Sequence, residues 1–337
     1  MKKNRDYNFG DYLKLFKGEI PSRDLPFEFF LNSELEEHIS GEKFIPGDTA
    51  HNLSLRMKAW GIAGYDYLPL LATDMSFKDG EFEKKETISL NHPALITDWE
   101  SFEKYEWPDP DRQGYALLEQ AEKLLPEGMK LIVFGPDGVL ENTINLLGFD
   151  NLCYLLYDDP ELVSAVTEKI GDVFERYYSV CASADGVGAL FSNDDWGFKT
   201  SLMISLADMK KFIVPRHKRI TDAAKRHGKP VILHSCGMLD DAMDIIIDEL
   251  GYDGKHSYED VIRPVEDAYE LIGSRIAVLG GMDVDYLVRA DEKQIYERAS
   301  AMLERTRGCG RYALGSGNSV PEYVPMSKYF AMMKALK

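Results

Sequence analysis

The chain has 337 residues, of which 45% are hydrophobic and 28% charged, the balance of a globular protein with a sizeable core. Its 57 acidic residues outnumber the 39 basic ones, and the resulting net charge of -18 argues against binding to nucleic acid or to an anionic membrane surface. No stretch approaches the roughly 20 apolar residues of a membrane span, and no apolar signal core follows the basic first residues, so we expect a cytoplasmic protein.

Short apolar runs alternate with long amphipathic segments along the chain. The runs predicted to be strands are, in order, 65–71, 130–135, 186–193, 230–236, 252–258, 275–281 and 311–317, with an eighth strand expected within 85–97. Helices are expected between them, including 159–184 and 205–228, and Pro215 should kink or divide the second of these. This alternation implies parallel strands joined by helical crossovers.

Regular alternation from about residue 125 onward predicts a (β/α)8 TIM barrel, and the chain length suits a barrel of about 250 residues with extensions. We expect residues 1–55 to form an N-terminal helical extension that packs on a barrel of residues 56–337. The competing doubly wound sheet needs a glycine-rich phosphate turn after its first strand, and the spacing of FGPDGVLEN at 134–142 is too loose for one.

Polar residues follow nearly every predicted strand, which is where a barrel places its active site. We expect these strand ends to converge on one pocket: Asp137; Ser192, Asp194 and Asp195; His234 and Cys236; His256 and Glu259; Gly281 and Asp283; Ser316 and Asn318.

His234 and Cys236 are the strongest candidates for a metal site. Side chains at i and i+2 of a strand point to the same face, so both would reach a common ion, and imidazole with thiolate favours zinc. The alternative is a hydrogen-bonded core histidine beside a small buried thiol.

Asp194 and Asp195 end a neighbouring strand in FSNDDWG. We predict that Asp194 faces the pocket as a metal ligand or general acid, because Ser192 shares its face; a cap for the following helix is the alternative. His217 and His227 lie on the predicted helix that precedes VILHSCG, and both are expected to face solvent.

Two glycine-rich strand ends complete the predicted pocket. Gly281 precedes Asp283 in GGMDVD, which is consistent with close approach of the backbone to a ligand. Gly315, Ser316 and Gly317 in ALGSGNSVP would bind a ligand anion through backbone N–H groups, unless they form a plain turn.

The order and spacing of several motifs resemble those of the uroporphyrinogen decarboxylase superfamily, which includes cobalamin-dependent methyltransferases. The markers are GPDGVLEN, the DPELV helix, LFSNDDWG, VILHSCG, ELGYDGKHSYED, VLGGMD and ALGSGNSVP. The resemblance implies a TIM barrel with the active site at its mouth. In the methyltransferase branch, His-x-Cys-Gly binds zinc together with a cysteine of the C-terminal glycine-rich loop. That third position is Ser316 here, so we expect a carboxylate, Asp194 or Glu259, to replace it.

The resemblance therefore implies a methyltransferase that activates a small methylated substrate, favoured to be an O-methyl compound, with zinc. The methyl group would pass to cobalamin on a separate corrinoid protein, with Asp283 and Asn318 orienting the substrate, and a homodimer is compatible with the superfamily. One alternative is a metal-free decarboxylase, although Arg56 stands alone where that branch has several arginines. Another is a non-catalytic protein that binds a corrinoid or tetrapyrrole.

Overall fold

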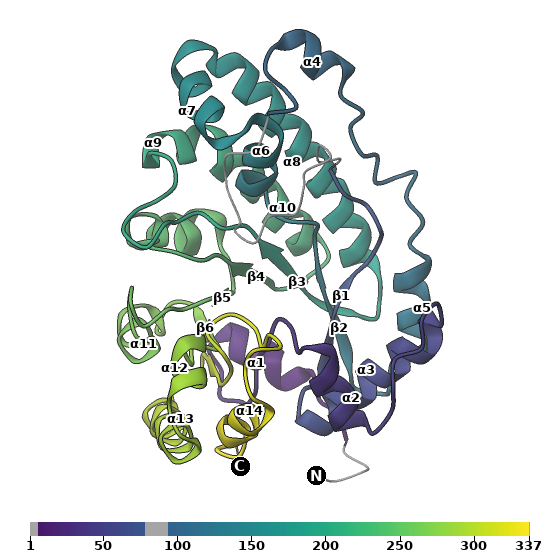
Figure 1. Cartoon of the computed structure of the whole chain (residues 1–337), viewed down its shortest axis with the longest axis vertical. Coiled ribbons are helices and arrows are strands. Elements are labelled where there is room, and N and C mark those ends of the chain that lie inside the picture. The colour runs from purple at the N-terminus through teal and green to yellow at the C-terminus, as the bar shows by residue number, and fades with distance from the viewer. Residues whose placement is uncertain (1–5, 78–93, 337) are drawn as a thin grey trace.

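A computed structural model describes residues 6–77 and 94–336. Its centre is a curled, all-parallel sheet in which the strands follow one another in chain order (Figure 1). The strands are β1 (Tyr67–Leu71), β2 (Lys130–Phe134), β3 (Val187–Asn193), β4 (Val231–His234), β5 (Gly254–His256), β6 (Ala277–Leu279) and β7 (Tyr312–Ala313). Each lies within a run predicted from the sequence, so these seven predictions are confirmed.

Helices connect the strands and cover the convex side of the sheet, where α8 and α10 pack together (Figure 1). The α-helices are α1 (Gly10–Lys17), α2 (Ser33–Ser40), α3 (Thr49–Ala63), α4 (Trp99–Lys104), α5 (Ala116–Leu124), α6 (Val139–Leu147), α7 (Phe149–Asp158), α8 (Pro160–Ser183), α9 (Leu206–Asp208), α10 (Val214–Arg226), α11 (Val265–Ile272), α12 (Val284–Arg289), α13 (Glu292–Thr306) and α14 (Met326–Met333). Shorter turns are η1 (Met209–Ile213), η2 (Asp240–Ala242) and η3 (Ile245–Leu250).

Two sequence predictions about helices can be compared directly with these bounds. The expected division at Pro215 is confirmed: the π-helical turn η1 ends at Ile213, and Pro215 lies in the first turn of α10, where its missing N–H costs nothing. The predicted boundary between residues 55 and 56 falls inside α3, and the division into an extension and a barrel stays a prediction.

The eighth strand expected within 85–97 is not found in the described part of that range, since residues 94–97 form no strand and 85–93 lie outside the described residues. The segment 25–31 instead lies between β7 and β1. The Phe27 N–H donates to the Leu314 carbonyl (2.7 Å), the Leu314 N–H donates to the Leu25 carbonyl (2.8 Å), and the Tyr67 hydroxyl donates to the Glu28 carbonyl (2.7 Å). The fold is therefore TIM-barrel-like, with seven described strands.

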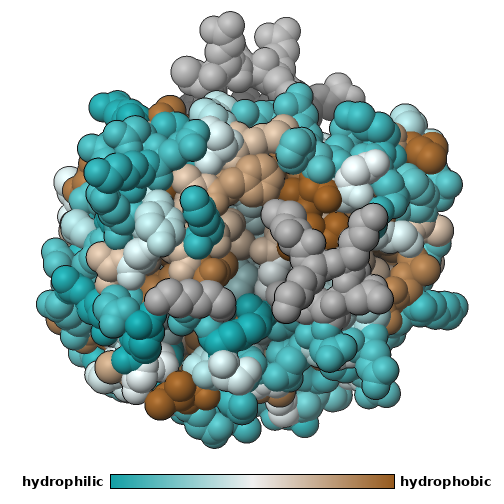
Figure 2. All heavy atoms as spheres, turned by 90° about the horizontal axis from the view of Figure 1, so that it is seen from below, coloured by the Kyte–Doolittle hydropathy of each residue, from teal (hydrophilic) through white to brown (hydrophobic). Residues whose placement is uncertain are grey.

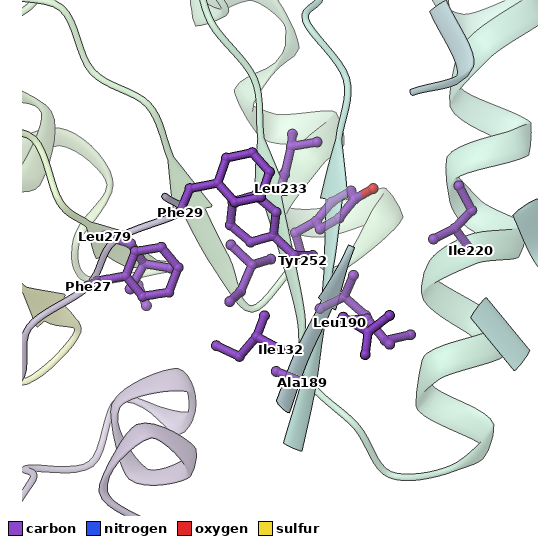
Figure 3. Close-up of a cluster of buried hydrophobic side chains, with 14 of the residues drawn as sticks. Phe27, Phe29, Ile132, Ala189, Leu190, Ile220, Leu233, Tyr252 and Leu279 are labelled. Atoms are coloured by element: carbon purple, nitrogen blue, oxygen red, sulfur yellow. The ribbon is translucent and has the colours of Figure 1, made fainter. Parts of the chain in front are cut away.

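The segment 25–31 also fills the concave side of the sheet. Phe27 and Phe29 project from it towards the strands, and Ile220 lies on α10, on the other side of the strands (Figure 3). The Phe29 ring lies 4.4 Å from that of Phe191 on β3, measured between centroids, and both rings are buried. Each such buried side chain contributes roughly 1.5–3 kcal/mol, so this segment anchors the interior of the sheet.

The face of the molecule drawn in Figure 2 is mainly polar. Figure 2 shows hydrophilic residues around most of the face seen from below, with hydrophobic ones gathered nearer its middle. Among residues 6–77 and 94–336, no helix combines the length and the hydropathy needed to cross a bilayer.

Candidate metal centre

Three potential metal ligands meet where β3 and β4 end. One ligand atom from each of Asp195, His234 and Cys236 lies within 4.8 Å of the other two. The two strands pair in register, Asn193 opposite His234, and the Cys236 N–H donates to Asp195 Oδ1 (2.8 Å). Adjacent parallel strands thus carry a carboxylate, an imidazole and a thiol to one point at the rim of the sheet.

The prediction that Asp194 faces this point is wrong, because the alternation along β3 has the opposite phase. Phe191 points into the barrel, where its ring centroid is 5.7 Å from that of His234. Asp195 follows the same phase, whereas Ser192 and Asp194 point to the helical layer. Asp195 is therefore the carboxylate that accompanies His234 and Cys236.

Asp194 is fully buried and joins the sheet to two helices. Its carboxylate accepts hydrogen bonds from the N–H groups of Leu140 and Glu141, both 3.0 Å, at the start of α6. It also accepts from Trp196 Nε1 (2.9 Å) and lies 2.7 Å from His217 Nε2. Asp194 therefore caps α6, which comes earlier in the chain, and not the following helix that the sequence suggested as the alternative.

His217 was expected to face solvent and is instead fully buried on α10. Its Nε2 meets Asp194, and its Nδ1 lies 2.7 Å from the Tyr252 hydroxyl. The exposed His227 agrees with its prediction. Helical periodicity could not predict the burial of His217, because its partner Asp194 follows β3 and is brought to α10 only by the fold.

His234 presents one ring nitrogen to the site and holds the other with a second histidine. Its Nδ1 lies 2.8 Å from Nδ1 of His256, and its Nε2 lies 3.7 Å from Cys236 Sγ. Burial lowers the pKa of His234 to about 4, although the Asp195 carboxylate opposes this shift. At neutral pH the ring is uncharged, so Nε2 can offer a lone pair when Nδ1 donates its proton to His256.

Cys236 has polar neighbours that fix its sulfur. Asn318 Nδ2 donates to Sγ (3.4 Å), and the Ser257 hydroxyl lies 3.1 Å from it. Burial, reinforced by the Asp195 carboxylate, raises the pKa of the thiol well above its usual range. A cation is therefore needed at this point before the thiolate, which is the metal-binding form, becomes stable.

Other predicted site residues lie outside this group of three. Asp283 accepts hydrogen bonds from the N–H groups of Tyr286 (2.9 Å) and Asp260 (2.8 Å), and so it caps α12. Asp283, Glu259 and Asn318 line one groove beside the site. The catalytic roles of Asp283 and Asn318 stay predictions.

Ser316, at the position implied for a third cysteine, is engaged elsewhere. Its N–H donates to Glu28 Oε1 and its hydroxyl to Oε2, both at 2.6 Å, and both residues are fully buried. Burial raises the pKa of Glu28 to about 8, against the lowering effect of these hydrogen bonds. Ser316 therefore ties the C-terminal glycine-rich loop to the segment 25–31.

The predicted ligand-binding glycines are all packed against the protein itself. A Cβ on Gly315 would lie 1.7 Å from the Phe27 carbonyl oxygen, and one on Gly317 would lie 2.2 Å from that of Tyr258. Gly281 has a φ of +111°, and its Cβ would lie 2.2 Å from Val265. These contacts explain the glycines without a ligand, and a role in cofactor binding stays a prediction.

Sequence reasoning missed several residues around the site. The Phe29 ring lies 5.2 Å from that of His234, and only the tertiary fold brings it there. Burial, with the carboxylates of Asp194, Asp195 and Asp137, raises the pKa of Glu141 to about 9. Lys255 is buried on β5. A charged residue inside a predicted strand was the sequence signal that could have identified it as a candidate site residue.

Comparison with known proteins supports the family resemblance and the fold. Residues 71–337 match the family described as uroporphyrinogen decarboxylase (URO-D). A uroporphyrinogen decarboxylase of Bacillus mycoides is 27% identical over 269 residues, which cover 77% of this chain and 71% of that protein. A Bacillus cereus protein of the same name is 26% identical over 181 residues, covering 52% of this chain and 48% of its own length.

A solved structure is similar over nearly the whole chain. The methyltransferase from Methanosarcina mazei aligns with a TM-score of 0.73 at 16% identity and covers 98% of both chains. At that identity the likeness establishes a shared fold. Because the family match spans most of the chain, this protein belongs to the uroporphyrinogen decarboxylase (URO-D) family.

Proposed function

We propose that this protein is a methyltransferase that takes the methyl group of a small methylated substrate, favoured to be an O-methyl compound, and passes it to a corrinoid protein. Zinc would be held by Asp195, His234 and Cys236. The observation that carries the proposal is the meeting of these three donors at the rim of a TIM-barrel-like sheet. The fold shared with a methyltransferase supports it.

The donor set fits zinc in number and chemistry. Three protein ligands that leave one position open are typical of catalytic zinc, and nitrogen, sulfur and oxygen donors all bind it. An oxygen donor in place of a further thiolate makes the site harder, which suits an oxygen-bearing substrate. When bound there, zinc supplies Lewis acidity towards the heteroatom that carries the methyl group.

Neighbouring residues fix the orientation of His234 and Cys236. His256 orients the His234 ring through the contact between their Nδ1 atoms, and Asn318 donates to the Cys236 sulfur. The Phe29 ring lies 5.2 Å from the His234 ring, measured between centroids, and gives that side of the site an apolar neighbour. The proposal assigns cobalamin to a partner protein.

Purified protein is expected to retain about one zinc ion per chain, bound through one sulfur and several nitrogen or oxygen atoms. Elemental analysis and X-ray absorption at the zinc edge measure the amount and the donors. Cys236→Ser, which is similar in size, should lose the sulfur signal and most of the metal. Metal-free protein that takes up no zinc on incubation would contradict the proposal.

A decarboxylase is the second candidate, because the matched family and the curated relatives carry that name. It needs no metal, so the two functions are separable. Under the methyltransferase proposal, incubation with uroporphyrinogen should yield no coproporphyrinogen by fluorescence-detected chromatography. Formation of that product by both the native protein and Cys236→Ser would favour the decarboxylase.

A further inference from the structure

A buried cation without a matching carboxylate lies close to the metal centre. Lys255 is 5% exposed, its Nζ donates to the Ser257 carbonyl, and the same atom lies 4.1 Å from the centre of the Tyr258 ring. Within the described part of the chain, no Asp or Glu oxygen lies within 4.0 Å of Nζ. A buried charge normally needs an ion partner, since taking it out of water costs several kcal/mol.

Lys255 lines a cavity whose walls are mainly apolar. Because side chains alternate along β5, Lys255 points away from the barrel interior that His256 enters. The apolar walls of the cavity come from the turns after β4, from the segment between β5 and α11, and from α11 itself: Leu239, Met243, Ile262, Ala268, Leu271 and Ile272. A cation in such a cavity complements an anion attached to an apolar body.

Other charged groups at the cavity do not neutralise Lys255 directly. Arg263 and Asp240 pair with each other at 2.5 Å across the rim. Burial lowers the pKa of Lys255 to about 8, against the opposing effects of Cys236, Asp195, Glu259 and Asp240. None of the three carboxylates lies within 4.0 Å of Nζ, so none of them forms an ion pair with it.

One strained residue joins the cavity to the metal centre. Ser257 is buried with a φ of +82°, a backbone conformation that is uncommon outside glycine and that clusters at functional sites. Its carbonyl accepts from Lys255, while its hydroxyl lies 3.1 Å from Cys236 Sγ. Ser257 therefore links the Lys255 ammonium to the Cys236 sulfur, one of the three metal donors.

We propose that Lys255 binds the carboxylate of an apolar carboxylic acid in this cavity, so that the methylated substrate is one that carries a carboxylate group. The second part rests on the proposed methyltransferase function, whereas the carboxylate site itself does not. The apolar walls hold the body of the molecule, and Lys255 supplies the charge-assisted contact that selects an acid over its amide.

Titration calorimetry at pH 7 with benzoate and hexanoate, each compared with its neutral amide, tests the site. The native protein should bind the acids about tenfold or more tightly than the amides, the effect of one hydrogen bond to a charged group. Lys255→Met should abolish this preference and remain folded, because an apolar side chain of similar length replaces a buried charge. Lys218→Met, which removes an exposed lysine of α10, is the matched control and should keep the preference.

Two results would overturn the carboxylate site: folded native protein that binds neither acid, or an equal preference for acids in the native protein and Lys255→Met. Zinc analysis separates this site from the proposed function. Cys236→Ser should lose zinc and keep the preference for acids, while Lys255→Met should keep zinc and lose that preference. Acid binding by a protein that takes up no zinc would leave the carboxylate site standing and refute the methyltransferase.

Discussion

Asp195→Asn is expected to lower zinc affinity about a hundredfold or more with little effect on the stability of the fold. The same change at Asp194 is expected to lower the stability of the fold with little effect on zinc affinity. Removing an outer-shell partner of a metal ligand already costs 10–100-fold, and Asp195 lies among the ligands themselves. An asparagine at position 195 keeps an oxygen that can accept from the Cys236 N–H, so the local backbone should survive.

Asp194→Asn is expected to lower the free energy of unfolding by about 3–5 kcal/mol, the usual cost of breaking a buried charged network. The carboxylate faces two backbone N–H groups, the Trp196 indole and His217. An amide NH2 in its place would point a donor at other donors and leave buried groups unpaired.

Urea unfolding and competition with a chromophoric zinc chelator measure the two effects in the same pair of variants. Each variant serves as the control for the other, because the residues are adjacent and the substitution is identical. Loss of zinc in Asp194→Asn with stability unchanged, or unchanged zinc affinity in Asp195→Asn, would contradict the assignment of the inward carboxylate.

Glu28→Gln is expected to remove a large part of the pH dependence of stability between about pH 4.5 and pH 8. The folded pKa of Glu28, about 8, lies above its ordinary value of 4.5 because the carboxyl is buried. The folded chain therefore binds an extra proton in this window, so its free energy of unfolding falls as the pH rises, by at most about 5 kcal/mol, and levels off above pH 8. The glutamine is nearly isosteric and can still accept from the Ser316 N–H.

Urea unfolding at several pH values from 5 to 9 gives the slope for the native protein, Glu28→Gln and Glu34→Gln. Glu34 is an exposed glutamate on α2, so its variant should follow the native slope. Glu141, whose pKa is raised to about 9, contributes a fall of the same sign that remains in all three. Equal slopes in Glu28→Gln and the native protein would refute the buried, protonated state of Glu28.

Local sequence patterns were sufficient to predict the positions of the seven described strands, the strand–helix order and the His234–Cys236 pair. These follow from local rules: apolar runs mark strands, amphipathic segments mark helices, and residues two apart on a strand share a face. The same rules located the break at Pro215, where the missing N–H acts within its own helix.

Long-range packing selects the carboxylate that joins that pair. Alternation along the strand puts Ser192 and Asp194 on one face and Phe191 and Asp195 on the other, but it does not say which face points into the barrel. The packing of Phe191 against His234 and the contact of Asp194 with His217 identify the inward face. The contact of Glu28 with Ser316 spans 288 residues, and the segment 25–31 lies beside β7 because that edge of the sheet offers it backbone partners. Such contacts depend on how distant segments pack, which no local pattern records.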